Sequence, residues 1–221
     1  MAHSRVSLRL VWFLVFTTSL LGMAQCSVLP LATGANGALY RDGFDDSQSQ
    51  WVLEADLEAS ARIADGQLLL NVLEPNLVTW AQLTDRTFGD FVLEVEATQV
   101  SGPNNNSYGV LFRVQDPTAY YRFDISGDGY YAVTRRDPTG GGRWTWLTGD
   151  WVPSTAIHQG ASTNRIRVLA QGSHFVFWVN GEQLTEADDK TYSRGAIGLN
   201  AGSFDEPGVM VSFDNLTITK P

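Results

Sequence analysis

The stretch FVLEVEATQ, residues 91–99, alternates apolar with polar side chains along most of its length. Successive side chains on an extended strand point to opposite sides, so the apolar residues share one face. These residues are Phe91, Leu93, Val95 and Ala97. An amphipathic helix would repeat its apolar residues every three to four positions instead. The alternation therefore predicts a β-strand with one face in the core.

Similar short runs lie on both sides of this stretch, separated by turn residues. The dipeptides Asp65-Gly66 and Asn180-Gly181 are typical of two-residue hairpin turns. Further strands are expected at residues 68–72, 107–114, 120–125, 130–136, 143–147, 164–170, 174–179, 182–185, 194–199 and 209–219. About a dozen strands with no helical apolar stripe predict an all-β, two-sheet antiparallel sandwich with a single core.

Composition excludes several functional classes. The 221 residues carry a net charge of −9, whereas a protein that binds nucleic acid needs a basic patch. The single cysteine cannot form a disulfide framework or a cysteine-rich zinc site.

The N-terminus has the pattern of an export signal. Arg5 and Arg9 precede the apolar run LVWFLVFTTSLL, residues 10–21. A membrane-spanning helix needs roughly 20 apolar residues, whereas the apolar region of a signal peptide takes about 7–15. We expect a signal peptide over residues 1–25, a flexible tether over residues 26–38 and one folded domain over residues 39–220.

Cys26 directly follows this segment, and the sequence resembles a bacterial lipoprotein signal at Met23, Ala24 and Cys26. The resemblance implies that Cys26 is lipidated and holds the domain on a membrane of the cell envelope. Gln25 departs from the small residue usual before the cysteine. The alternative is ordinary cleavage after Ala24, which would give a secreted protein. Both interpretations export the domain.

Seven segments together resemble the concanavalin A-like (laminin G, lectin and glucanase) jelly-roll superfamily. They are YRDGFDD at 40–46, DGQLLL at 65–70, FGDFVLEVEAT at 88–98, YGVLFRVQDPTAYYRFDISGDGYY at 108–131, FWVNGEQL at 177–184, GAIGLNAG at 195–202 and VSFDNLTI at 211–218. The resemblance implies a jelly-roll sandwich. It leaves function open, because this fold carries lectins, hydrolases and adhesive modules.

Four assumed strand registers place a candidate ligand face opposite the core. They pair Ile125 with Tyr130, Val114 with Tyr120, Thr98 with Tyr108, and Arg135 with Trp144. The expected core face comprises Leu93, Val95, Leu111, Phe123, Ile125 and Ala132. The opposite face would gather Glu94, Glu96, Tyr108, Phe112, Tyr120, Arg122, Asp124, Tyr131, Arg135, Trp144 and Trp146.

Flat aromatic rings beside arginines and carboxylates suit a carbohydrate, since rings stack on sugars and charged groups bond hydroxyls. We predict ligand binding by Trp144, Trp146, Tyr131, Arg122, Asp124, Arg135, Tyr120 and Glu94. Trp144 and Trp146 are the strongest candidates, because residues 140–142 before them are all glycine. The alternative is that these residues form cross-strand pairs that only stabilise the sheet.

The sequence supports catalysis less than it supports ligand binding. Laminarinase-like hydrolases of the superfamily carry an E-x-D-x-x-E strand, and Glu94 and Glu96 would supply two acids about 6.5–7 Å apart. The third acid is missing, because residues 97–99 are Ala-Thr-Gln. The strand order also resembles that of the 3-keto-disaccharide hydrolase family, without a matching catalytic set. We expect a non-catalytic domain that binds carbohydrate or another surface polymer; an envelope glycan hydrolase of either type and a structural adhesion module are the alternatives.

We expect no cofactor, and calcium is the one metal ion for which the sequence offers candidate ligands. Asp45-Asp46 and Asp214-Asn215 are expected on the first and last strands, which are neighbours in such sandwiches. Calcium takes oxygen ligands of this kind, so Asp45 and Asp214 are candidate ligands. Turn capping by Asp and Asn explains the same residues.

Overall fold

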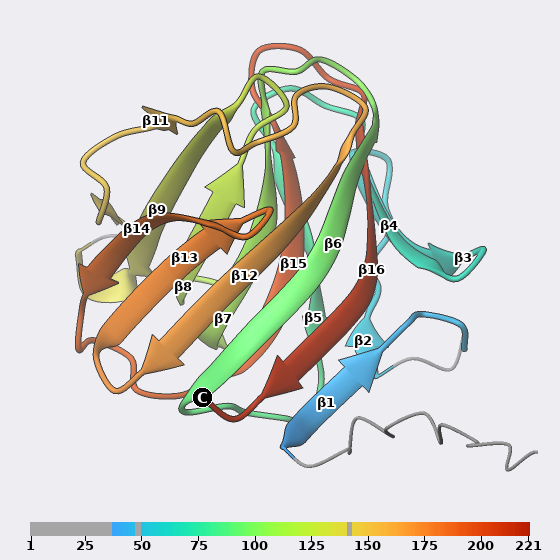
Figure 1. Cartoon of the computed structure of the whole chain (residues 1–221). Coiled ribbons are helices and arrows are strands. Elements are labelled where there is room, and N and C mark those ends of the chain that lie inside the picture. Colours follow the sequence, from blue (N-terminus) through green and yellow to red (C-terminus); the bar gives the residue numbers. More distant parts are fainter. Residues whose placement is uncertain (1–36, 47–49, 141–142) are drawn as a thin grey trace, which may run out of the picture. The chain divides into compact units, whose positions relative to one another are not determined.

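The computed structural model describes residues 37–46, 50–140 and 143–221, and within these ranges the chain forms two eight-stranded antiparallel sheets (Figure 1). Sheet A comprises β1 (Ala38–Asp42), β3 (Ala59–Ala64), β4 (Gln67–Val72), β6 (Phe91–Ser101), β12 (Thr163–Gln171), β13 (His174–Val179), β14 (Glu182–Asp188) and β16 (Val209–Thr219). Sheet B comprises β2 (Trp51–Val52), β5 (Val78–Leu83), β7 (Asn106–Asp116), β8 (Ala119–Ile125), β9 (Tyr130–Asp137), β10 (Arg143–Trp146), β11 (Val152–Pro153) and β15 (Ala196–Ser203).

The strand order is β14-β13-β12-β6-β16-β4-β3 in sheet A, with β1 also paired to β16. In sheet B it is β10-β9-β8-β7-β15-β5-β2, with β11 also paired to β9. One 3₁₀ turn, η1 (Pro138–Gly140), precedes β10. The described part of the chain has no helix long and apolar enough to cross a membrane. The predicted all-β, two-sheet sandwich is confirmed.

Both predicted dipeptide turns form as expected. Asp65 and Gly66 have φ values of 54° and 72°, and Asn180 and Gly181 have 53° and 87°. Positive φ at both central residues matches the twist of the strands that such a turn joins, and Asn, Asp and Gly tolerate it best. The turns therefore set the registers of β3 with β4 and of β13 with β14.

The core lies between the two sheets and is rich in aromatic rings. Phe91, Leu93, Val95 and Ala97 of β6 are almost completely buried, as the alternation predicts. From sheet B, Phe112 stacks on Tyr121 with ring centroids 5.1 Å apart. Across the sandwich, Phe123 meets Phe177 of β13 at 4.8 Å. Offset and tilted contacts of this kind add to the free energy gained from burial alone.

Three of the four assumed registers are wrong. Ile125 pairs with Tyr131, because Ser126 N–H bonds the Tyr130 carbonyl and lengthens the hairpin. Trp144 pairs with Arg136, and Arg135 pairs with Thr145.

The other two assumed registers involve β7. Val114 and Tyr120 lie in one outer cluster, in a stretch where the β7–β8 ladder is interrupted. A bulge at Arg113, whose φ is 51°, breaks the β7–β8 register after the pair Phe112 and Tyr121. Thr98 lies opposite Thr163 in sheet A, because the chain crosses to sheet B between β6 and β7.

A shift of one residue turns side chains to the opposite face of a strand. Tyr108, Phe112 and Tyr131 therefore point into the core, where the sequence placed them outside. Leu111 and Ala132 point outward instead. Leu111 belongs to a small cluster on the outer side of sheet B. Ala132 lies between the core residues Tyr131 and Val133, so its side chain points to the other face. The predicted division of side chains between the two faces was thus wrong in β7 and in β9, where Arg135 also points to the opposite side from the one predicted.

Candidate functional site

Five of the eight predicted ligand residues lie on the outer face of sheet B, which we call the sheet B face. Tyr120, Arg122 and Asp124 alternate along β8, and Trp144 and Trp146 alternate along β10. Strand pairing places Arg122 beside Thr134 of β9, and Trp146 on the far side of Thr134. The face thus runs across β8, β9 and the edge strand β10.

Aromatic rings and arginines gather around Trp144. Its ring meets Tyr120 edge-on at a centroid distance of 5.9 Å. The guanidinium carbons of Arg122 and Arg136 lie 4.7 Å and 5.6 Å from the Trp144 ring centroid. Trp144 nevertheless remains 37% exposed and Trp146 39% exposed. Cation–π contacts hold the Trp144 ring in place while solvent, or a ligand, still reaches it.

A charged group lies beside these rings. Arg122 Nε is 2.6 Å from Asp124 Oδ2, and Asn200 Nδ2 donates to Asp124 Oδ1 at 2.8 Å. The Asp124 side chain is only 2% exposed. Burial raises the pKa of Asp124 above the ordinary value, against the opposing effects of Arg122 and Asn200. This carboxyl is therefore unlike an ordinary surface acid.

Gly109 explains how Asn200 reaches Asp124. Gly109 pairs with Asp124 on one side and with Asn200 on the other, so it lies between them. A Cβ at Gly109 would lie 2.0 Å from the Phe123 carbonyl oxygen, which leaves no room for a side chain. The gap lets the Asn200 amide extend across β7 to the carboxyl.

Four buried polar atoms on this face remain without a hydrogen bond. Among the residues the structure describes, these are Arg122 Nε, Thr134 Oγ1, Arg136 Nε and Asn200 Oδ1, although Arg122 Nε also lies in the ion pair with Asp124. Buried polar groups are almost always paired, so an unpaired one calls for an explanation. Unused hydrogen-bonding capacity beside Arg122 and Asp124 suits a ligand that carries hydroxyl groups.

The other three predicted residues lie elsewhere, so the prediction that they share this face is wrong. Tyr131 points into the core, and its hydroxyl donates to the Leu184 carbonyl at 3.0 Å. Glu94 lies in sheet A, 3.6 Å from Arg167. The neighbouring Glu96 also lies in sheet A.

Glu96 accepts hydrogen bonds from Asn215 and Arg165, and these bonds lower the pKa of Glu96. Its carboxylate is held in the charged form by cross-strand partners.

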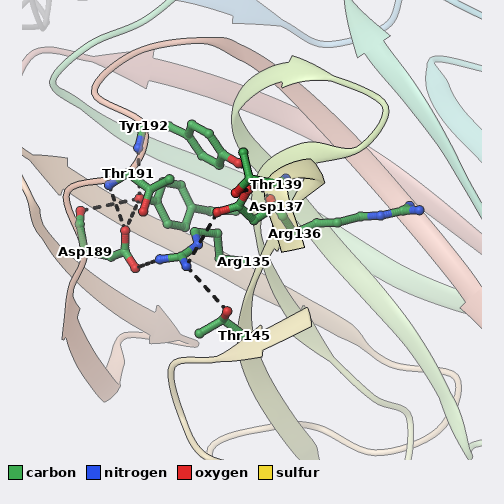
Figure 2. A network of polar contacts seen from close by, with 9 residues as sticks. Arg135, Arg136, Asp137, Thr139, Thr145, Asp189, Thr191 and Tyr192 are labelled. Atoms are coloured by element: carbon green, nitrogen blue, oxygen red, sulfur yellow. Dashed lines mark hydrogen bonds and ion pairs between the residues drawn. The ribbon is translucent and has the colours of Figure 1, made fainter. Parts of the chain in front are cut away.

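Arg135 belongs to a polar cluster that we call the Asp189 clamp: Tyr121, Arg135, Asp189 and Thr191. Figure 2 labels Arg135, Asp189 and Thr191 of this cluster. Arg135 forms an ion pair with Asp189. The Tyr121 hydroxyl donates to Asp189 Oδ1 at 2.6 Å, and Thr191 N–H donates to the same oxygen at 2.8 Å. Burial raises the pKa of Tyr121 to about 12, which keeps this hydroxyl a donor.

Burial opposes the charged form of Asp189, but the hydrogen bonds and Arg135 outweigh it and lower the pKa of Asp189. Next along the chain, the Tyr192 hydroxyl donates to the Arg136 carbonyl at 3.0 Å. Figure 2 shows the Arg136 side chain running away from the clamp. The clamp thus fixes the segment after β14 to β9, directly behind the residues that support Trp144.

Comparison with known proteins places the chain in a family. The family model for the 3-keto-alpha-glucoside-1,2-lyase-like domain matches residues 36–219. The chain belongs to this family. No curated protein matches its sequence.

Solved structures with the same fold include the carbohydrate-binding module CBM66 from Bacillus subtilis, at a TM-score of 0.53 and 16% identity over 78% of this chain and 96% of that one. A β-glucanase from Bacillus licheniformis matches at a TM-score of 0.61 and 12% identity, over 85% of this chain and 100% of that one. At these identities the likeness shows the fold, and it confirms the concanavalin A-like jelly roll.

In this 3-keto-alpha-glucoside-1,2-lyase-like domain, β1 and β16 are neighbours, as expected for the calcium hypothesis. Asp214 lies on β16, but β1 ends at Asp42, so Asp45 and Asp46 lie after the first strand and the prediction that they lie on it is wrong. Asp45 Oδ1 lies near the Asp65-Gly66 turn, 3.4 Å from where a Cβ of Gly66 would be. Asp214 Oδ1 accepts the Asn215 N–H at 2.6 Å. Among the described residues, no three His, Cys, Asp or Glu side chains come together as a metal site. Calcium binding at Asp45 and Asp214 stays a prediction.

The predicted signal peptide, most of the tether and Cys26 lie outside the described residues of the domain. Sequence reasoning did not identify Asn200, Thr134 or Arg136 as members of the site. Asn200 lies on β15, which joins β7 only through long-range pairing. The segment GAIGLNAG, residues 195–202, carries small residues on both faces and therefore gave no sign of which side Asn200 occupies.

Proposed function

We propose that the domain is an exported, lipid-anchored module that binds carbohydrate or another surface polymer through the sheet B face, without cleaving it. The observation that carries the proposal is the convergence of exposed Trp144 with two arginines and a buried carboxyl on one face. Sites for small ligands combine apolar walls with a few placed polar groups in this way.

In the proposed complex, a sugar ring stacks on Trp144 or Trp146, which are the exposed rings of β10. Arg122 donates hydrogen bonds to its hydroxyls. The unpaired oxygens of Thr134 and Asn200 accept hydrogen bonds from other hydroxyls. A carbohydrate-binding module and a β-glucanase share this fold, which supports a glycan as the ligand.

A glycan array tests the proposal with the wild-type domain, a Trp144→Ala/Trp146→Ala variant and a Trp178→Ala control. Trp178 lies in sheet A, where Arg167 stacks on it at 5.0 Å, so the control removes the same side-chain type from the other sheet. We expect binding by the wild type and the control and its loss in the double variant. A folded wild-type domain that binds no glycan would refute the proposal.

A second candidate function is elimination from a 3-keto-α-glucoside, as the family description suggests. In such a reaction a carboxylate removes the C2 proton, which the C3 ketone makes acidic. The C1–C2 double bond forms as the C1–O bond breaks, and the departing oxygen takes up a proton. The raised pKa of Asp124 favours this residue as the base, because general bases work best with a pKa near the working pH.

Incubation with a 3-keto-α-glucoside separates the two functions. Turnover by the wild type that disappears in Asp124→Asn, while the variant still binds the sugar, would establish catalysis by Asp124. Binding without turnover in the wild type would leave the non-catalytic function in place.

Membrane attachment through Cys26 is tested by Cys26→Ser. We expect the wild type in the membrane fraction and the variant in the soluble exported fraction. Identical fractionation of the two would favour cleavage after Ala24, with no lipid at Cys26.

A further inference from the structure

A hollow of about 440 Å³ lies at the end of the sheet B face. Its lining residues are Asn76, Asn105, Ser126, Asp128, Tyr130, Trp151, Phe204 and Asp205. These residues come from the segments that flank β5, β7, β8, β9, β11 and β15, at one end of sheet B. Three aromatic rings and several amide, hydroxyl and carboxylate groups therefore surround a space large enough for a sugar unit.

The hollow is continuous with the sheet B face. The Trp146 ring meets Trp151 at a centroid distance of 6.4 Å, and Trp151 meets Phe204 at 6.0 Å. Ser126 directly follows β8, two residues after Asp124, and lines the hollow. A chain of rings thus leads from Trp146 into the hollow, and a chain of polar residues leads there along β8.

The turn between β8 and β9 holds one wall of the hollow in a fixed shape. Ser126 Oγ accepts the Tyr130 N–H at 3.0 Å and donates to Asp128 Oδ1. Gly129 has a φ of 92°, and a Cβ there would lie 2.7 Å from Gln159 Nε2. Asp128 and Tyr130 are therefore positioned before any ligand arrives, which reduces the entropy cost of binding.

The charges around the hollow select its ligand. Both charged lining residues, Asp128 and Asp205, are acids, and Tyr130, Trp151 and Phe204 offer ring faces or edges. A protonated amine is attracted both by carboxylates and by aromatic ring faces. A carboxylate on a ligand would be repelled by the same acids. The lining therefore favours an amino sugar and disfavours a uronic acid.

We propose that this hollow is a second subsite, which takes a sugar unit with a protonated amino group from the glycan bound on the sheet B face. The inference rests on the proposed carbohydrate binding and adds the class of sugar to it. The glycan then extends from Trp144 and Trp146 past Trp151 into the hollow. Its sugar ring lies against Trp151 or Tyr130, and its ammonium group lies between Asp128 and Asp205.

Calorimetry with two oligosaccharides of equal length tests the subsite: a β-1,4-linked glucosamine oligomer and its fully N-acetylated counterpart. We expect the wild type to bind the glucosamine oligomer about tenfold more tightly, with a preference that shrinks as salt is added. Asp128→Asn/Asp205→Asn should lose the preference, and Glu206→Gln, an exposed acid outside the lining, should keep it. Trp144→Ala should weaken both oligomers equally.

Three results would overturn the subsite. These are equal affinity of the wild type for both oligomers, a preference that survives in the double Asn variant, and no binding of the glucosamine oligomer or of glucosamine itself. Equal affinities that both fall in Trp144→Ala would refute the subsite and leave the sheet B face intact. Binding of the glucosamine oligomer that depends on Asp128 and Asp205 but not on Trp144 or Trp146 would keep the subsite and refute the face.

Discussion

Two adjacent arginines of β9 point to opposite sides of the strand, and replacing each with methionine separates stability from ligand binding. Arg135 pairs with Asp189 in the clamp, whereas Arg136 lies against the Trp144 ring on the sheet B face. Methionine keeps most of the length and apolar volume of either side chain. The two variants therefore differ mainly in which charged contact is removed.

The magnitudes follow from burial and contacts. The side chains of Arg135 and Asp189 are 19% and 10% exposed, so Arg135→Met leaves a largely buried carboxylate without its cation. Breaking a fully buried pair costs roughly 3–5 kcal/mol, and the remaining bonds from Tyr121 and Thr191 reduce this to about 2 kcal/mol of unfolding free energy. Arg136→Met removes a cation–π contact worth about 0.5–1 kcal/mol at a partly exposed site. Because that contact orients the Trp144 ring on which the sugar would stack, we expect about a two- to fivefold loss of glycan affinity.

Lowering the pH should reveal how much the ion pair of Arg135 with Asp189 contributes to the unfolding free energy. The pKa of Asp189 is lowered in the folded state, so its contribution to stability is complete above the unfolded value near 4 and is lost as the pH falls through the lower folded value. Without Arg135 that pKa rises, and less stability remains to be lost below pH 4.

Urea unfolding followed by tryptophan fluorescence measures stability, and calorimetry with the best array ligand measures affinity. We expect Arg135→Met to unfold at lower urea yet bind within twofold of wild type. We expect Arg136→Met to lose no more than about 1 kcal/mol of unfolding free energy and to bind the glycan two- to fivefold more weakly. An Arg135→Met variant with unchanged stability and lost binding would contradict this assignment and restore Arg135 as a ligand residue.

Three further predictions concern other parts of the domain. Glu94→Gln should change neither glycan affinity nor turnover and should alter unfolding free energy by less than about 1 kcal/mol, since its ion pair with Arg167 is partly exposed; a larger loss of either activity would revive the sheet A acids as functional. Gly66→Ala should cost about 1–2 kcal/mol in urea unfolding because φ is 72° there, and an unchanged midpoint would contradict the turn geometry. In wild type, the raised pKa of Asp124 means that its carboxyl destabilises the fold as the pH rises from about 4 through that value, so Asp124→Asn should flatten this part of the stability profile; identical profiles would count against the burial of Asp124.

Much of the fold follows from local sequence. The alternation in residues 91–99 and the Asp65-Gly66 and Asn180-Gly181 turns depend on neighbouring residues alone, and all three form as predicted. Where local rules do not fix the geometry, prediction failed. The bulge at Arg113 and the longer hairpin after Ile125 shift the register by a residue, and neither has the signature of a tight turn.

The candidate site depended on those registers. Trp144, Arg122 and Asp124 were correctly grouped because the two one-residue errors, between β8 and β9 and between β9 and β10, cancel. Glu94 was wrongly added, because β6 and β7 follow one another in sequence but belong to different sheets. Asn200 was missed because it is distant in sequence and reaches the site only through the long-range pairing of β15 with β7.

Amide chemical-shift mapping with the tightest-binding glycan is the most direct test of the sheet B face as the binding site. We expect the largest shifts on β8, β9, β10 and β15, on the side-chain amide of Asn200, and on the indole N–H groups of Trp144 and Trp146. Shifts confined to β6, β12, β13 and β16, with sheet B unchanged, would place the ligand on sheet A and contradict this expectation.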